Sequence, residues 1–304
     1  MTRVYTGGPP DDRPYTIRRF FAEEIEAVAK LQTPGLVEAL ATVPRERFLR
    51  PGPWDVLADA DFMAGTSSRT RLTPDADPRR VYHNIVVAID PARQLFNGQP
   101  STLTNWIDAL GLVPGARVVH VGCGLGYYAA ILAQAVGASG RVIAYEVDDA
   151  LAIEARQNLA FMPWVEVCHG DASAPCGEPE EFHAILVNAG VTHPLDAWLD
   201  ALAPGGRMVV PLTGMMPVMG SNIGKGLVWL LTKQDDGDFA ARVLGMAAIY
   251  SAVGIRDESL NERLGKAMMG GPGQWQAVKR LRRDAHEPAP SCWFHTPTCC
   301  LSLG

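Results

Sequence analysis

A glycine-rich segment near the middle of the chain constrains its fold more than any other feature. Residues 118–126 read Val-Val-His-Val-Gly-Cys-Gly-Leu-Gly, and the carboxylate Glu146 follows the last glycine by twenty residues, at the end of a second apolar run. Residues 117–121 have strand character, the glycines permit a tight turn because they lack a Cβ, and residues 127–136 can continue as a helix. The pattern predicts a strand, turn and helix that bind a nucleotide-like cofactor, with Glu146 accepting hydrogen bonds from ribose hydroxyls.

The spacing of the glycines distinguishes between cofactors. A dinucleotide fingerprint requires a third glycine three residues after the second, and that position is Tyr127. The observed order, Gly122-x-Gly124-x-Gly126, instead favours S-adenosylmethionine, which has no pyrophosphate. A nicotinamide oxidoreductase is therefore a weak alternative, and a purely structural turn remains open on this motif alone.

Further strand candidates alternate with helices and predict an α/β fold with a Rossmann-like, mostly parallel sheet. Ligands of such sheets lie beyond the carboxyl ends of the strands, where the sequence places several more residues that we expect to contact the cofactor. Asp171 would accept from the adenine amino group. The expected contacts in addition to the glycines and Glu146 are Cys123, Val147, Asp171, Ala172 and Asn188. Later, residues 227–232 and 239–248 flank Asp-Asp-Gly-Asp, which predicts a terminal antiparallel hairpin.

With these motifs the chain resembles the class I S-adenosylmethionine methyltransferases and, within them, the protein-L-isoaspartate (D-aspartate) O-methyltransferases. The resemblance covers roughly residues 15–253, and its subfamily-specific parts are Val-Pro-Arg-Glu-Arg-Phe at 43–48 and Gly98-Gln99. It implies S-adenosyl-L-methionine as cofactor and methyl transfer to the isoaspartyl or aspartyl carboxylate of a peptide or protein, which permits repair through a succinimide. It also implies that Gln99, Ser101 and Thr102 contact the substrate, with Thr102 and Ser101 orienting the acceptor as catalytic residues.

A carboxylate acceptor is already ionised at neutral pH, because a free carboxyl has a pKa of about 4. No general base is then required, and we expect His120, in the first central strand, to be a core residue.

The chain also departs from the family pattern. The family usually reads Gly-Gln-Thr-Ile-Ser where this chain reads Gly-Gln-Pro-Ser-Thr at 98–102, and about fifty residues beyond Val253 have no counterpart. Two alternatives therefore stay open: a methyltransferase that modifies a biosynthetic precursor peptide, and a methyltransferase-fold protein that binds the cofactor without catalysis. Ser101 or Thr102 could also be the N-cap of the helix that follows.

The expected organisation has four parts. Residues 1–14 form a flexible N-terminus, and 15–100 form an N-terminal helical cap with substrate-side loops. Residues 101–253 form the S-adenosylmethionine-binding domain, and 254–304 form a C-terminal extension that Trp293 and Phe294 pin to the body.

Composition limits the partners. A net charge of −6 with 20% well-mixed charged residues argues against nonspecific nucleic-acid binding, and the basic cluster at 279–283 is expected to be a solvated helix face. No apolar stretch reaches the roughly 20 residues that span a bilayer, and no signal-peptide core is present, so we expect a cytoplasmic protein without membrane contact.

The six cysteines show no paired framework, so we expect free thiols. Cys292, His295 and Cys299 could in principle meet a metal ion, but their spacing matches no common zinc pattern, and we expect no metal.

Overall fold

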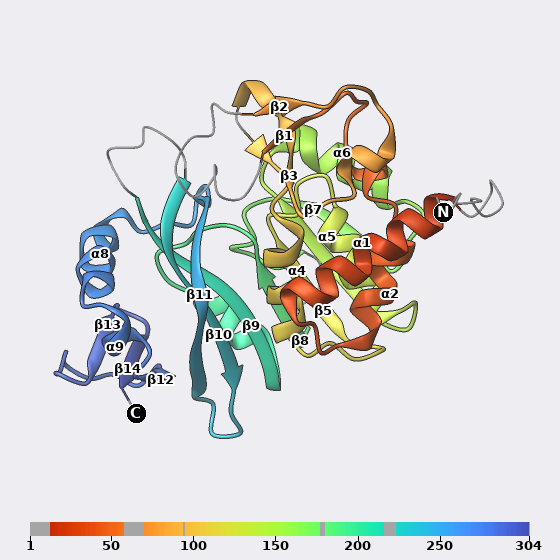
Figure 1. Cartoon of the computed structure of the whole chain (residues 1–304). Helices are drawn as coiled ribbons and strands as arrows, with labels where there is room; N and C mark the ends of the chain where they lie inside the picture. Colours follow the sequence, from red (N-terminus) through yellow and green to blue (C-terminus); the bar gives the residue numbers. More distant parts are fainter. Residues whose placement is uncertain (1–12, 58–69, 94, 177–179, 216–222, 304) are drawn as a thin grey trace, which may run out of the picture.

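The computed structural model describes residues 13–57, 70–93, 95–176, 180–215 and 223–303. Its centre is a ten-stranded sheet with the strand order β13-β14-β12-β11-β10-β9-β8-β5-β6-β7 (Figure 1). The strands of this sheet are β5 (Arg117–Val121), β6 (Arg141–Glu146), β7 (Val165–His169), β8 (Phe182–Val187), β9 (Leu202–Met215), β10 (Ile223–Lys233), β11 (Phe239–Tyr250), β12 (Val278–Arg282), β13 (Cys292–His295) and β14 (Cys300–Leu303).

One half of the sheet is parallel and the other antiparallel. Strands β7, β6, β5, β8 and β9 run parallel to one another, and β9, β10 and β11 then form an antiparallel meander. Both the Rossmann-like class and the terminal hairpin that the sequence predicts are confirmed. The hairpin turn closes where Gln234 N–H donates to Asp238 O at 2.7 Å and Gly237, with φ +86°, adopts the left-handed conformation that a glycine tolerates.

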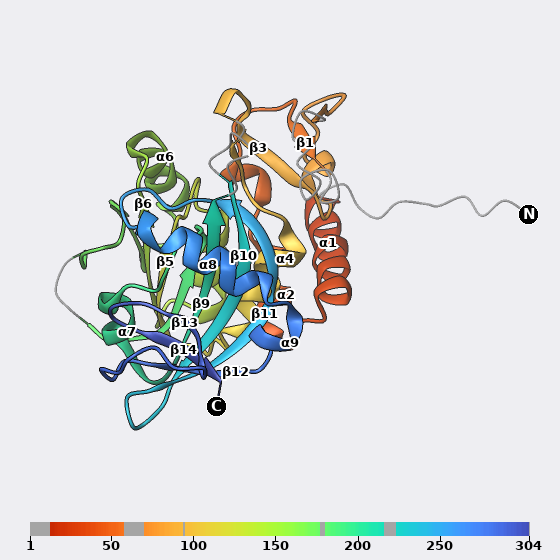
Figure 2. The same cartoon turned by 90° about the vertical axis from the view of Figure 1, so that its left-hand side faces the viewer.

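Helices cover both faces of the sheet (Figures 1 and 2). The helices are α1 (Arg13–Ala29), α2 (Pro34–Thr42), α4 (Pro100–Ala109), α5 (Tyr127–Val136), α6 (Asp149–Leu159), α7 (Asp196–Ala201), α8 (Asn261–Met269) and α9 (Pro272–Trp275). One core joins apolar side chains of α1, α2, α4 and α5 to the sheet, with Phe21, Trp106 and Ile131 among its members. The opposite core joins α7 and α8 to the sheet and includes Trp198 and Leu264. Residues 127–136 form a helix as predicted, and that helix is buried on almost every side.

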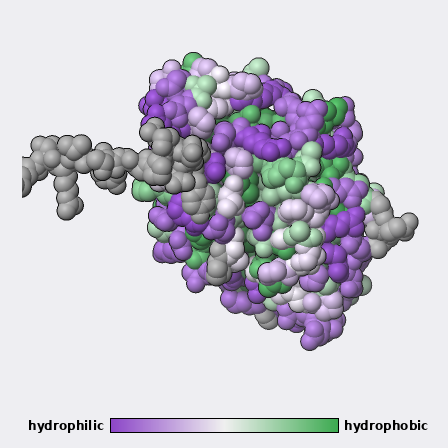
Figure 3. Space-filling view, turned by 90° about the vertical axis from the view of Figure 1, so that its right-hand side faces the viewer, coloured by the Kyte–Doolittle hydropathy of each residue, from purple (hydrophilic) through white to green (hydrophobic). Residues whose placement is uncertain are grey.

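The N-terminal part contains the expected helical cap, in which α1 packs on α2 and α2 on α5. Figure 3 shows this side of the molecule, where hydrophilic side chains interleave with apolar ones. The part also contains a second, four-stranded sheet of order β2-β1-β3-β4, which the sequence did not predict. Its strands are β1 (Asp55–Leu57), β2 (Arg71–Leu72), β3 (Val86–Asp90) and β4 (Leu95–Phe96), accompanied by the short 3₁₀ helices η2 (Arg45–Phe48), η4 (Pro78–Val81) and η5 (Pro91–Arg93).

The C-terminal extension continues the main sheet. Strand β12 pairs with the beginning of β11, where Phe239 aligns with Leu281, and a 3₁₀ helix, η7 (Glu258–Leu260), leads into α8. The Trp293 ring lies 5.2 Å from that of Trp229, and Phe294 is buried, so the expectation that these two aromatics pin the extension is confirmed. The boundaries of the four expected parts stay predictions, and residues 1–12 lie outside the described residues.

The basic cluster lies mainly on a strand, not on a helix. Arg280 forms an ion pair with Asp238, and Arg283 pairs with Asp196 and Asp200. None of the helices in the described ranges combines the length and the hydropathy that crossing a bilayer demands.

One expectation about the cysteines is wrong. Cys168 at the end of β7 forms a disulfide with Cys176, eight residues later. The loop after β7 turns back toward the strand, and Cys176 N–H donates to the Tyr145 hydroxyl at 2.7 Å on the neighbouring strand β6. The sequence separation alone could not show this return of the chain.

Candidate active site

A cavity of about 400 Å³ lies at the carboxyl ends of the parallel strands. It brings together most of the residues that the sequence singled out: Gln99, Thr102, Gly122, Cys123, Gly124, Glu146, Val147 and Asn188. The other walls include Val86, Leu95 and Trp106 on one side and Ala247 and Tyr250, near the end of β11, on the other. Its volume is within the range that is typical of small-molecule sites.

The glycine turn is shaped by positive φ angles at Gly122 (+78°), Gly124 (+56°) and Gly126 (+98°), a region that side chains with a Cβ rarely adopt. A Cβ on Gly122 would lie 3.1 Å from the carbonyl oxygen of Asn188. Gly126 is the N-cap of α5 and does not line the cavity; a Cβ there would lie 2.8 Å from Leu159 Cδ1. The first two glycines thus border the cavity, while the third allows α5 to pack closely on α6.

Glu146 ends β6 with its side chain buried against this turn. Its Oε2 accepts from Gly124 N–H at 2.7 Å, and its Oε1 accepts from Asp148 N–H at 3.1 Å. Burial raises the pKa of Glu146 above its ordinary value, and the two backbone donors oppose that shift. A carboxylate has about four lone-pair sites, so each oxygen can accept a further hydrogen bond, as a ribose diol requires.

Asp171 and Ala172 follow β7 but are not part of the cavity wall. Asp171 lies next to Gly254, where an added Cβ would be 2.7 Å from Asp171 Oδ2, one residue beyond the cavity-lining Val253. A hydrogen bond from the Ser173 side chain is the main cause that lowers the pKa of Asp171, so the carboxylate is ionised at neutral pH. Ala172, with φ +61°, turns the chain and accepts from the Trp198 indole at 2.8 Å. A contact of this pair with adenine stays a prediction.

Helix α4 borders the cavity on the side where we expect the substrate to bind. The N-cap of this helix is Gln99, and Pro100 is its first residue, so the interpretation of Ser101 or Thr102 as the N-cap is wrong. Proline is favoured at the first helical position because its missing N–H needs no partner there. Thr102 lines the cavity, whereas Ser101 does not, and Ser101 N–H donates to Asn84 Oδ1 at 3.0 Å.

Residues that the sequence analysis did not select complete this side. Asn97 lines the cavity, and its Oδ1 accepts from Val87 N–H at 3.0 Å. Its Nδ2 is buried, and the part of the chain that the structure describes offers it no hydrogen-bond partner. Its position directly before Gly98-Gln99 is the one sequence signal that could have identified it. The contribution of the end of β11 to the cavity could not be predicted from the sequence. Tyr250 is more than a hundred residues from the glycine turn and reaches the cavity only because β11 pairs within the sheet.

The Val-Pro-Arg-Glu segment supports this wall from behind. Arg45 is fully buried, and its guanidinium donates to the carbonyl oxygens of Val81 at 2.6 Å, His83 at 3.0 Å and Ile85 at 2.8 Å. It also lies 3.4 Å from Asn97 Oδ1. The resemblance is therefore based partly on a residue that anchors the substrate-side segment and does not itself line the cavity.

His120 and Cys123 offer no reactive group here. His120 is fully buried in β5, which confirms it as a core residue, and burial lowers its pKa to about 3. Burial also raises the pKa of the Cys123 thiol, so that the thiol stays protonated.

The residues present suit S-adenosylmethionine. The glycine turn leaves room for a ligand beside Gly122 and Gly124, Glu146 offers acceptors for two ribose hydroxyls, and the exposed apolar side chain of Val147 adjoins them. Tyr127, where a dinucleotide fingerprint requires glycine, is buried as the first residue of α5.

Comparisons with known proteins agree with this geometry. The profile of the family described as protein-L-isoaspartate(D-aspartate) O-methyltransferase (PCMT) matches residues 56–241. The protein-L-isoaspartate O-methyltransferase of Aeropyrum pernix is 30% identical over 209 residues, which cover 67% of this chain and 70% of that protein. Other relatives match over 106 to 223 residues, which cover between 43% and 100% of their own length.

Solved structures share the fold. A protein-L-isoaspartate O-methyltransferase superimposes with a TM-score of 0.60 at 22% identity, covering 82% of this chain and 69% of the other. A Plasmodium falciparum structure described as a putative protein-L-isoaspartate O-methyltransferase, in complex with S-adenosyl-L-homocysteine, gives a TM-score of 0.56 at 16% identity and covers 77% and 97%. The chain is an S-adenosylmethionine-dependent methyltransferase and belongs to the protein-L-isoaspartate (D-aspartate) O-methyltransferase family.

Proposed function

We propose that this protein methylates the side-chain carboxylate of an isoaspartyl or aspartyl residue in a peptide or protein. S-adenosylmethionine supplies the methyl group from its sulfonium when it is bound. The observation that carries the proposal is that one cavity contains both Glu146, on the cofactor side, and Thr102, on the substrate side.

The chemistry of the cavity wall suits an acceptor that needs no deprotonation. Among the described residues that line the cavity there is no histidine, and its carboxylates are Glu146 and Asp148. Glu146 is engaged by backbone N–H groups, and Asp148 accepts from Arg93 at 2.6 Å and from Leu151 N–H at 3.1 Å. Because an aspartyl carboxylate is ionised at neutral pH, positioning and the exclusion of water are the tasks left to the protein.

Thr102 and Gln99 are the residues that we assign to positioning. Both line the cavity at the first turn of α4, where the positive end of the helix dipole favours a negatively charged acceptor. The Thr102 hydroxyl would donate to the acceptor carboxylate and hold it within reach of the methyl group.

Transfer of labelled methyl groups to matched peptides tests the proposal. The peptides share one sequence and differ only in an isoaspartyl or an aspartyl residue. We expect a base-labile methyl ester on the isoaspartyl peptide. Transfer to the aspartyl peptide alone would indicate a precursor-modifying enzyme, and calorimetric binding of S-adenosylmethionine without transfer to any peptide or protein would contradict catalysis.

The neighbouring residues Thr102 and Ser101 both carry hydroxyls, so one provides the test variant and the other a matched control. Thr102→Val should leave cofactor affinity unchanged and lower kcat/KM about tenfold or more, because one hydrogen bond to a charged acceptor contributes about 1.5–3 kcal/mol. Ser101→Ala, whose side chain lies outside the cavity wall, should retain activity. Equal losses in both variants would remove Thr102 from the proposed role.

A further inference from the structure

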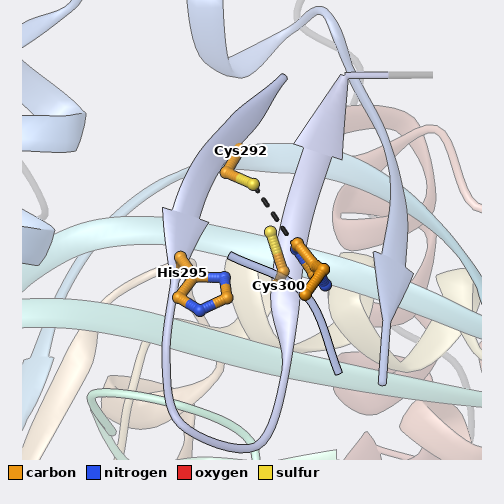
Figure 4. Close-up of side chains that lie close together, drawn as sticks. Cys292, His295 and Cys300 are labelled. Carbon is orange, nitrogen blue, oxygen red and sulfur yellow. Dashed lines mark hydrogen bonds between the residues drawn. The ribbon is translucent and has the colours of Figure 1, made fainter. Parts of the chain in front are cut away.

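Four side chains that can bind a metal ion converge in the C-terminal extension. We propose that His286, Cys292, His295 and Cys300 together bind one structural zinc ion. The ligand atoms of these four residues all lie within 4.8 Å of one another, and none of the four lines the active-site cavity. Figure 4 shows Cys292, His295 and Cys300 directed toward a common point between β13 and β14.

Strand pairing explains how three of the ligands share one face. His295 on β13 pairs directly with Cys300 on the antiparallel strand β14. Cys292 and His295 are three residues apart and would point to opposite faces of a regular strand. The register shifts between Cys292 and Phe294, however, and this bulge turns Cys292 to the same face as His295.

The fourth ligand arrives from the segment between β12 and β13. His286 Nδ1 lies 2.8 Å from the carbonyl oxygen of Asp284, so this nitrogen is placed to donate its proton there. The lone pair is then on Nε2, which lies 3.5 Å from Cys292 Sγ. A backbone carbonyl that fixes the tautomer of a ligating histidine is the usual outer partner in zinc sites.

The thiols of the cluster have only weak contacts with backbone groups: Cys292 Sγ accepts from Ala289 N–H at 3.3 Å, and Cys300 Sγ lies 3.8 Å from Leu301 O. His295 Nδ1 is buried and has no hydrogen-bond partner among the described residues. Cys292 and Cys300 are free thiols, and Cys300 is fully buried. Buried polar nitrogens without a partner are rare in folded proteins, and a coordinated cation would satisfy this one.

The donor set matches zinc in charge and geometry. Two thiolates and two neutral imidazoles neutralise Zn²⁺ and are a common tetrahedral set in structural sites. Tetrahedral zinc with ordinary bond lengths holds its donors about 3.3–3.8 Å apart. The observed separations of at most 4.8 Å therefore need only a small contraction of the cluster.

The sequence suggested a different trio, which included Cys299. This thiol is buried, and its Sγ contacts Thr296 Oγ1 at 3.4 Å in the turn between β13 and β14. The next residue, Cys300, takes the ligand position because it pairs with His295.

A metal ion here would stabilise the outer edge of the main sheet. The strands β12, β13 and β14 contain four or five residues each and lie at that edge. The site would connect the hairpin to the segment that follows β12. Arg263 Nη2 donates to His295 O at 2.5 Å, so α8 is connected to the same hairpin.

Metal content of the full-length protein tests this proposal without reference to methyl transfer. We expect one zinc per chain by mass spectrometry after purification without chelators. Replacement by cobalt should give the visible bands of a tetrahedral thiolate site. Less than a tenth of a zinc per chain, together with no such bands after cobalt addition, would overturn the proposal.

Neighbouring cysteines supply the matched variants. Cys292→Ser and Cys300→Ser should each lower bound zinc at least tenfold, whereas Cys299→Ser should retain one zinc per chain. Zinc at the wild-type level in both Cys292→Ser and Cys300→Ser would refute the assignment.

The intact protein keeps the test decisive even if those variants fail to fold. Chelator treatment of the wild type should release zinc and make the Cys292 and Cys300 thiols newly reactive toward a maleimide, as mapped by peptide mass spectrometry. A disulfide between Cys292 and Cys300 in the isolated protein would contradict the proposal.

Discussion

At the scale of single residues, Glu146 links the glycine turn to the next strand before any ligand binds. Its two oxygens accept from Gly124 and Asp148 N–H groups, so the side chain is held in one orientation. A fixed acceptor loses little conformational freedom when the cofactor binds, which favours affinity.

If Glu146 binds the ribose as we propose, its burial makes cofactor binding sensitive to acid. Because burial raises the pKa of Glu146 above the ordinary value of about 4.3, protonation begins at a higher pH than for an exposed glutamate. The protonated side chain loses its negative charge and part of its acceptor capacity. We therefore expect the affinity for S-adenosylmethionine, measured by calorimetry, to fall as the pH is lowered through the raised pKa.

The stability of the fold depends on pH in the opposite direction. The folded protein holds the proton on Glu146 more tightly than the unfolded chain does. The contribution of Glu146 to the free energy of unfolding therefore decreases as the pH rises from the ordinary pKa through the raised one.

Glu146→Gln separates these effects from general acid sensitivity. The variant should bind the cofactor about thirtyfold more weakly at neutral pH, the equivalent of about 2 kcal/mol for charge-assisted hydrogen bonds. Its remaining affinity should not change between neutral and mildly acidic pH. A variant with wild-type affinity, or with the wild-type pH profile, would show that Glu146 does not bind the ribose.

At the scale of elements, the disulfide determines the shape of the loop after β7. Cys168 and Cys176 close a loop that contains Asp171, the residue expected to face adenine. Opening this loop removes a restraint on the chain without removing any side chain of the cavity wall.

Cys176→Ser should therefore lower the free energy of unfolding by roughly 2.5 kcal/mol. This is the free-energy equivalent of the conformational entropy that a closed loop of this length removes from the unfolded chain. Chemical denaturation measures this change. A reductant should destabilise the wild type to a similar extent and leave Cys176→Ser unaffected. If the reductant lowered the stability of both proteins equally, the effect would come from elsewhere in the chain.

The cofactor motif could be predicted from the sequence because a strand, a glycine turn and a helix are determined by neighbouring residues. The bounds of β5 and α5 agree with the prediction for that reason. The small N-terminal sheet could not be predicted, since strands of two to five residues carry little periodicity. The contribution of β11 to the cavity and the disulfide depend on where distant segments meet, and residue types alone do not specify that.

At the scale of the whole molecule, one hydrogen-bonded sheet runs from the parallel strands into the C-terminal extension. One apolar core crosses the same boundary, with Trp229 and Phe239 on the meander and Leu281 and Phe294 on the extension. Shared hydrogen bonds and a shared core favour cooperative unfolding of the two parts.

Leu281→Ala tests this cooperativity. Removing a fully buried leucine should cost about 2–5 kcal/mol, and we expect calorimetry to show one transition moved to lower temperature as a whole. Met269→Ala, at a residue that is 84% exposed, should leave the transition unchanged. A separate early transition in Leu281→Ala, with cofactor binding retained above it, would show that the extension unfolds independently.

The different oxidation states of the cysteines in this chain have a practical consequence. Cys168 and Cys176 are oxidised to a disulfide, whereas Cys292 and Cys300 are thiols in the same chain. Thiol and disulfide populations follow the ambient reduction potential, and a bound metal removes thiolates from that exchange. A strong reductant would open the loop beside the cofactor site, and a strong oxidant would attack uncoordinated thiols in the hairpin. The disulfide and the free thiols therefore coexist only within a window of reduction potential, and the buffers used to handle the protein must stay inside it.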